Sequence, residues 1–76
     1  MKITIIGTGF VGVVSAAVYA SFGHEVFGLD IDAGKVASLN NGTVPFYEPD
    51  LESLLKTQLN KKHLHFTTDY KEAVSD

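Results

Sequence analysis

The sequence predicts an α/β fold, a parallel sheet with helices on both faces, and three observations support this prediction. Short apolar segments alternate with segments of helical periodicity, in the order strand-helix-strand-helix-helix-strand-helix. The first apolar segment runs into a Gly-x-Gly-x-x-Gly turn, from Gly7 to Gly12, that continues into a helical pattern. An acidic residue, Asp30, follows the second apolar segment. Parallel strands joined by helical crossovers form a layered sheet of this kind.

The first strand and the first helix are expected over residues 2–6 and 10–22. The strand is mostly apolar, which is typical of strands buried on both faces of a sheet. The helix lacks charged residues, which favours a buried position. Gly23 stands where a left-handed C-cap is expected. Small residues recur at every fourth position of the helix and would allow close packing on the sheet: Gly12, Ala16 and Ala20.

The second strand is expected over residues 25–29. Asp32 is a good N-cap for a helix over residues 33–40. Residues 43–49 hold both prolines and are therefore expected to be extended. A helix with an apolar stripe of leucines is expected over residues 49–60.

The last strand is expected over residues 63–67. The Asp69-x-x-Glu72 pattern resembles a capping box and predicts the start of a final helix. Together with the glycine turn, this element order predicts a Rossmann-type sheet in the order 3-2-1, truncated before a fourth strand. We therefore expect residues 1–76 to be the N-terminal, incomplete part of a larger nucleotide-binding domain.

The composition narrows the class of protein. The net charge of -3 argues against nucleic acid as the main partner. The absence of cysteine excludes disulfides, thiolate metal sites and thiol catalysis within this chain. No stretch reaches the roughly 18 apolar residues of a membrane span, and the start of the chain does not resemble a signal peptide. The cytoplasm is the expected location, with no membrane partner.

The glycine turn predicts a dinucleotide site. Gly7 lets the chain turn sharply, Gly9 lets a pyrophosphate approach the backbone, and Gly12 lets the helix lie close to the sheet. Amides of the first helical turn would then point at the phosphates, aided by the helix dipole. The predicted cofactor-binding residues of this turn are Gly7, Thr8, Gly9, Phe10, Val11 and Gly12.

Asp30 lies 18 residues after Gly12, where a carboxylate accepts hydrogen bonds from the adenosine ribose. A carboxylate there would also repel a 2′-phosphate, and the chain has no arginine to bind one, so NAD is favoured over NADP. Asp30 could instead cap the following helix, but Asp32 is better placed for that. Lys35 either reaches the ribose or pyrophosphate or is a solvated surface lysine.

The three histidines, His24, His63 and His65, are not expected to bind metal or to act in catalysis. His24 falls in a turn far from the carboxyl ends of the strands, and no carboxylate stands at metal-ligand spacing from the other two. We predict no catalytic residue and no metal ligand in this chain.

At four places the chain resembles the UDP-glucose/GDP-mannose dehydrogenase family. The matching segments are Ile6–Gly12, Gly28–Asp32 with Lys35-Val36, Leu39-Asn40-Asn41-Gly42, and Tyr47-Glu48-Pro49-x-Leu51. The resemblance implies an NAD-dependent, two-step oxidation of a sugar C6 alcohol to a carboxylate, with UDP-glucose as the substrate of the whole enzyme. It also implies that the Val11 backbone, Asp30 and Lys35 contact NAD. One departure is Asp50, where the family usually has glycine, so the helix there could begin differently.

The family's catalytic cysteine belongs to a later part of the chain, so these 76 residues alone are expected to be inactive. Alternatives stay open: another NAD-linked dehydrogenase (GDP-mannose, hydroxyacyl-CoA or 6-phosphogluconate type), a nucleotide-sensing regulatory module, or a structural piece without a ligand. We also expect a homo-oligomer, because an apolar first strand left at a sheet edge recruits other chains.

Overall fold

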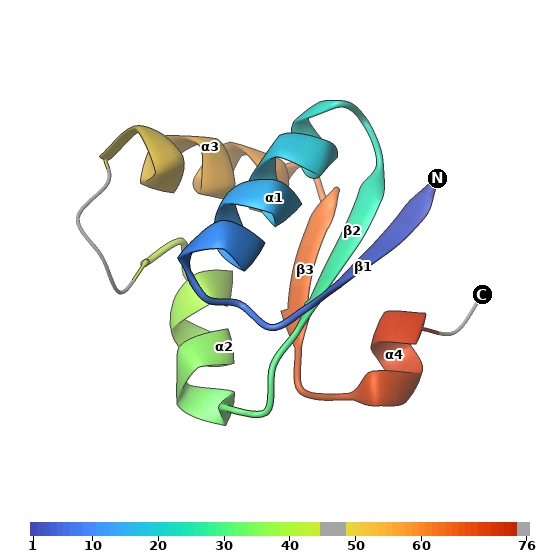
Figure 1. Cartoon of the computed structure of the whole chain (residues 1–76). Coiled ribbons are helices and arrows are strands. Elements are labelled where there is room, and N and C mark those ends of the chain that lie inside the picture. Colours follow the sequence, from blue (N-terminus) through green and yellow to red (C-terminus); the bar gives the residue numbers. More distant parts are fainter. Residues whose placement is uncertain (45–48, 75–76) are drawn as a thin grey trace.

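A computed structural model describes residues 1–44 and 49–74 of the chain, and these form a parallel sheet with helices on both faces (Figure 1). The elements are β1 (Lys2–Ile6), α1 (Phe10–Ser21), β2 (Glu25–Leu29), α2 (Ala33–Asn40), α3 (Pro49–Asn60), β3 (Leu64–Thr67) and α4 (Tyr70–Val74). The sheet order is β1-β2-β3 and both pairs are parallel, which confirms the predicted order. Helices α1, α2 and α3 cover one face of the sheet, and α4 lies on the other.

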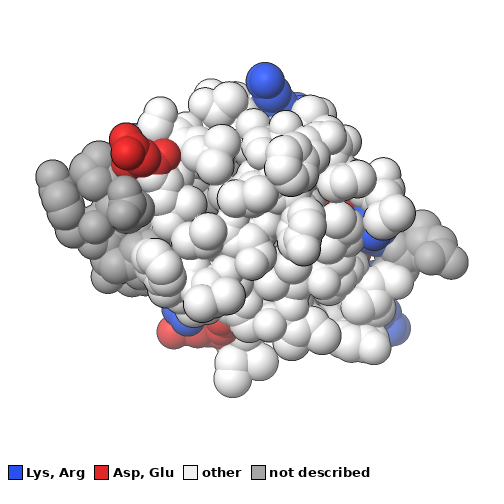
Figure 2. All heavy atoms as spheres, turned by 45° about the horizontal axis from the view of Figure 1, so that its top comes forward, with Lys and Arg blue, Asp and Glu red and all other residues white. Residues whose placement is uncertain are grey.

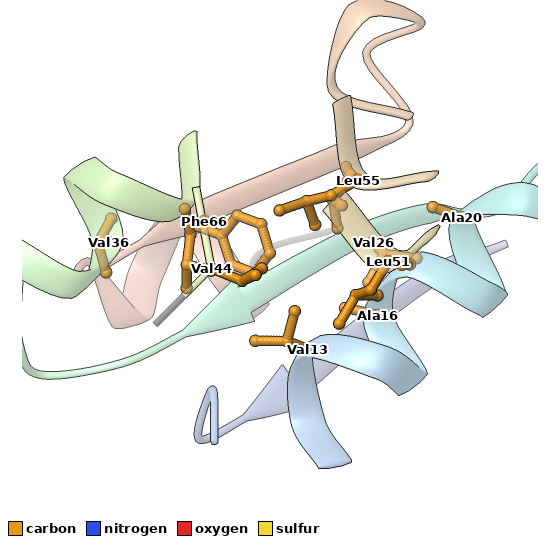
Figure 3. Packing of buried hydrophobic residues seen from close by; sticks show 12 residues of the cluster. Val13, Ala16, Ala20, Val26, Val36, Val44, Leu51, Leu55 and Phe66 are labelled. Carbon is orange, nitrogen blue, oxygen red and sulfur yellow. The ribbon is translucent and has the colours of Figure 1, made fainter. Parts of the chain in front are cut away.

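The strand register sorts the side chains onto two faces. Ile3 lies beside Val26, which lies beside Leu64, and this row belongs to the core under α1 and α3. The core is small and mostly aliphatic, as Figure 3 shows from close by. The next row, which contains Phe27 and His65, faces the opposite side, because neighbouring residues of a strand point to opposite faces.

Two expectations about burial are wrong. Ile6 is 75% exposed, and β1, in which it lies, has a strand neighbour on only one side among the described residues. Helix α1 is buried along one face only, and Phe22, its C-cap residue, is 73% exposed. The face in Figure 2 is mostly uncharged, with charged groups near its margins. The lack of charge in α1 therefore predicted its burial wrongly, because only one side of the helix contacts the sheet and α3.

The helix ends mostly follow their predicted chemistry. Gly23 has a φ of 92°, the left-handed conformation expected after α1. The Asp32 carboxylate accepts a hydrogen bond from the amide of Lys35 at 3.1 Å and caps α2. The prediction for α4 is half right, because the Asp69 carboxylate accepts a hydrogen bond from the amide of Lys71. The Asp69 amide donates to the Thr67 hydroxyl at 3.0 Å. In a capping box this amide would instead donate to the side chain of Glu72.

Element boundaries shift slightly. Strand β3 begins at Leu64 and not at His63, and α1 ends at Ser21. Helix α3 begins at Pro49 as predicted, so the departure at Asp50 does not displace it. The predicted extended segment and the Tyr47-Glu48 pair fall mainly on residues 45–48, which lie outside the described residues.

Asn40, the last residue of α2, protects the outer edge of β3. Its side-chain amide donates to the carbonyl of Phe66 at 2.9 Å and accepts from the amide of Phe66 at 3.1 Å. The side chain thus makes the pair of bonds that a neighbouring strand would make. Unpaired groups at a strand edge otherwise attract other chains. This contact gives the first asparagine of the Asn40-Asn41-Gly42 segment a structural reason.

We expect Asn40→Ala to lower the free energy of unfolding by about 1–2 kcal/mol, because two backbone groups of Phe66 lose their partner. The matched control is Asn41→Ala, which changes an exposed neighbour of the same type. Urea unfolding with an unchanged m-value measures the difference. Equal losses in the two variants would contradict the edge-protecting role of Asn40.

Candidate dinucleotide-binding site

The site lies at the carboxyl ends of β1 and β2, where two turns meet. The turn from β1 to α1 contains Gly7 and Gly9, and Gly12 lies in the first turn of α1 itself. The turn from β2 to α2 contains Asp30. The amide of Gly7 donates to the carbonyl of Leu29 at 2.8 Å and ties the two turns together. Ligands of open α/β sheets bind at this end of the strands.

The three glycines of the turn have different surroundings. Gly7 has a φ of 88°, which side-chain-bearing residues rarely adopt. A Cβ atom on Gly12 would lie 2.2 Å from the carbonyl oxygen of Gly7, so only glycine lets α1 pass this close. A Cβ atom on Gly9 would meet nothing within 4 Å. Gly9 therefore faces open space, as expected for a glycine that leaves room for a ligand.

The N-terminus of α1 is suited to an anion. Its N-cap is Gly9, which offers no side chain to bond the first amides, and its first turn contains no acidic residue. The first bond of the helix runs from the amide of Val13 to the carbonyl of Gly9 at 2.9 Å. The amides of Val11 and Gly12 come before this bond, and the dipole adds partial positive charge. A phosphate is the natural ligand of such an end.

Asp30 is held by groups from both turns. Its Oδ2 accepts from the Thr8 hydroxyl at 2.7 Å and from the Thr8 amide at 3.1 Å. Its Oδ1 accepts from the amide of Asp32 at 3.0 Å. The Thr8 hydroxyl and then the Asp32 amide hold the pKa of the Asp30 carboxyl well below its usual range, although partial burial opposes this. Asp30 is thus an ionised, oriented acceptor at neutral pH.

Thr8, Asp30 and Lys35 lie together in the structure, and the other two residues both contact the Asp30 carboxylate. The Lys35 ammonium lies 3.4 Å from Asp30 Oδ2, so Lys35 pairs with this carboxylate, and its contact with the cofactor stays a prediction. Thr8 is 1% exposed, and both its hydroxyl and its amide are turned toward the carboxylate. That Thr8, like the other residues of the turn, touches the cofactor stays a prediction.

The sequence analysis did not identify Ile6 and Ile31 as apolar residues beside Asp30. A hollow of about 290 Å³ is lined by Ile6, Gly7, Leu29, Asp30 and Ile31. Ile31 is 98% exposed, although its side chain is strongly apolar. The only signal in the sequence is an isoleucine placed between two aspartates, directly after a strand. The hollow offers apolar walls next to a carboxylate, which suits a planar base attached to a sugar.

His65 lies in β3 and His63 directly precedes it, and both contact neighbouring side chains of the fold. The His65 ring stacks on the Phe27 ring with centroids 4.6 Å apart, on the sheet face of α4. His63 Nδ1 lies 3.3 Å from Gln58 Oε1 at the start of the strand, the end opposite to Asp30. In the part of the chain that the structure describes, no group of three His, Cys, Asp or Glu residues could hold a metal ion.

A parallel sheet with this glycine turn, and with an ionised carboxylate at the end of the second strand, defines a dinucleotide-binding domain. Residues 1–76 match the model of the NAD binding domain of the UDP-glucose/GDP-mannose dehydrogenase family. The chain belongs to this family, which confirms the predicted family and the predicted cofactor, NAD. Among the alternatives left open, the match favours a family enzyme over a nucleotide-sensing module or a structural piece without a ligand.

Known relatives agree with this assignment. An uncharacterized protein of Methanocaldococcus jannaschii is 54% identical over 71 residues, which are 93% of this chain and 8% of that protein. UDP-glucose 6-dehydrogenase of Rhizobium meliloti is 45% identical over 75 residues, 99% of this chain and 17% of that enzyme. A crystal structure of a ternary complex of GDP-mannose dehydrogenase from Pseudomonas aeruginosa matches with a TM-score of 0.91 and 43% identity, over 97% of this chain and 17% of that one.

The chain therefore spans about a sixth of the length of these proteins or less. Among the described residues, no helix has the length and apolar character needed to cross a membrane.

Proposed function

We propose that this chain supplies the NAD-binding part of an enzyme that oxidises the C6 alcohol of a nucleotide sugar to a carboxylate, with UDP-glucose as the substrate. The observation that carries the proposal is Asp30, an ionised acceptor fixed beside the N-terminus of α1, where the N-cap Gly9 makes no side-chain cap hydrogen bond. Relatives named for UDP-glucose and for GDP-mannose support the reaction class. The bound NAD would accept the hydride removed from the substrate.

The residues of the site fit the parts of NAD in order. The backbone at Gly9 and Val11 would bind the pyrophosphate at the end of α1. Asp30 would accept hydrogen bonds from the adenosine ribose. The apolar hollow next to Asp30, with Ile6 and Ile31 in its walls, would hold the adenine ring. A 2′-phosphate on the ribose would meet the negative charge of Asp30, so the site selects NAD and not NADP.

The groups that would react with the sugar are a separate part of the proposal. The sequence has no cysteine, so the family's cysteine nucleophile would come from outside these 76 residues. The incomplete N-terminal domain, the cytoplasmic location and the homo-oligomeric state expected from the sequence are part of the same proposal.

Enzyme assays of the full-length protein that carries this domain test the reaction. We expect NADH formation from NAD with UDP-glucose, and two NADH for each sugar, because an alcohol becomes a carboxylate in two oxidations. Turnover with GDP-mannose alone would replace the proposed sugar by the second candidate, for which GDP-mannose dehydrogenases among the relatives give support. No turnover with either sugar would reject the proposed reaction.

Asp30→Ala is expected to weaken NAD binding about 10- to 100-fold, because a hydrogen bond to a charged group contributes about 1.5–3 kcal/mol. The variant should also lose most of its preference for NAD over NADP. The control is Asp50→Ala, which removes an equal charge from an exposed position at the start of α3. Calorimetric titration of NAD and NADP into the wild-type protein and into each variant measures these affinities. Unchanged NAD binding in Asp30→Ala would remove the carboxylate from the site.

A further inference from the structure

Thr8 occupies a buried position between the two turns of the site. It is a polar residue with 1% exposure. Its methyl group packs over the middle of β2, where a Cβ atom on Gly28 would lie 3.3 Å from Thr8 Cγ2. Its hydroxyl points to Asp30 Oδ2 at 2.7 Å, and its amide lies 3.1 Å from the same oxygen. The side chain is therefore fixed by packing on one side and by the carboxylate on the other.

The hydrogen-bond donors around the Asp30 carboxylate differ in how easily a ligand could displace them. A carboxylate has about four acceptor positions on its two oxygens. Thr8 and the amide of Asp32 donate from turns that are part of the fold. Lys35 is the third partner of Oδ2, at the longer distance of 3.4 Å and at the end of a flexible side chain. A ribose hydroxyl could thus take the remaining position on Oδ1, and displacement of Lys35 would open the approach to the carboxylate.

We propose that Thr8 is a positioning residue that fixes the Asp30 carboxylate so that the site accepts the free ribose hydroxyls of NAD and rejects the 2′-phosphate of NADP. This inference rests on the proposed NAD site. A carboxylate held by two donors of one residue cannot rotate away from an approaching phosphate, so the repulsion between like charges is kept. A loosely held carboxylate would turn aside, and Lys35 would then be free to pair with the phosphate.

A pair of variants separates the hydroxyl of Thr8 from its packing. Thr8→Val keeps the shape and the methyl group over Gly28 but removes the hydroxyl. Thr8→Ser keeps the hydroxyl and removes the methyl group. The backbone amide of residue 8 is present in both. A merely structural role would make the serine variant at least as defective as the valine variant, because a valine fills the buried space and a serine leaves a gap.

The test is calorimetric titration of NAD and NADP into the full-length wild-type protein and into both variants, with thermal unfolding recorded in parallel. We expect the ratio of the NADP to the NAD dissociation constant to fall about tenfold in Thr8→Val, which corresponds to the loss of one charge-assisted hydrogen bond. The ratio in Thr8→Ser should stay within about twofold of wild type. If Thr8→Val does not fold, Thr8→Ala provides the same comparison with serine, since both lack the methyl group.

The results distinguish the two levels of the proposal. Wild-type protein that does not bind NAD would reject the proposed function together with this inference. Wild-type protein that prefers NAD, with the same preference in Thr8→Val, would reject the positioning role and leave the NAD site intact. An equal loss of preference in Thr8→Ser and Thr8→Val would also overturn the role of the hydroxyl.

Discussion

Replacing Gly9 with valine should raise the dissociation constant of NAD more than about 100-fold, while the domain stays folded. In the structure a Cβ atom at this position meets nothing within 4 Å, so the protein itself has room for the new side chain. The φ of Gly9 is -70° and its ψ is -172°, an extended conformation that valine adopts readily. The added methyl groups would instead fill the space in front of the α1 N-terminus, where the pyrophosphate is expected to lie.

The measurements for Gly9→Val are NAD titration and circular dichroism of the same preparation. We expect a native spectrum and a melting temperature close to that of wild type, with no binding signal. The control is Gly34→Ala in the first turn of α2, where the added Cβ makes only an ordinary contact of 3.4 Å with Asp32 Oδ1. An unfolded Gly9→Val protein would show that Gly9 has a structural role, and retained NAD binding would show that the phosphates lie elsewhere.

Gly12→Ala should clearly lower the stability of this chain, although alanine is the better helix former. Helix propensity alone would favour alanine over glycine by about 1 kcal/mol. The new Cβ atom, however, would lie 2.2 Å from the Gly7 carbonyl oxygen and 3.2 Å from its carbon. These are backbone atoms of a residue whose amide is bonded to Leu29, so they cannot move without disturbing the β1 turn.

The steric cost of Gly12→Ala therefore exceeds the gain in helix propensity. We expect a net loss of about 2–3 kcal/mol in the free energy of unfolding. The total for a domain of this size is about 4–11 kcal/mol. Gly34→Ala offers a matched comparison, since it also lies in a first helical turn but has ordinary contacts, and it should be neutral or stabilising. Urea unfolding of the two variants measures the contrast, and a stabilised Gly12→Ala protein would refute the close approach of α1.

The sequence by itself determined the order of the elements, the parallel sheet and the family whose cofactor is NAD. These features follow from local rules. The apolar periodicity sets strands and helices, Gly7 and Gly23 require positive φ angles, and Asp32 caps the helix that follows it. The position of Asp30 after β2 also comes from a local count along the chain, because the carboxyl ends of parallel strands share one edge of the sheet.

Only the tertiary structure decided which groups meet across that edge. Thr8 donates to Asp30 across 22 positions of sequence, and Asn40 pairs with Phe66 across 26. Such contacts depend on the strand register and on the tertiary packing of the two turns, which no local pattern encodes. The exposure of Ile6 and Ile31 has the same origin, because burial depends on what the fold places beside a side chain and not on its own hydrophobicity.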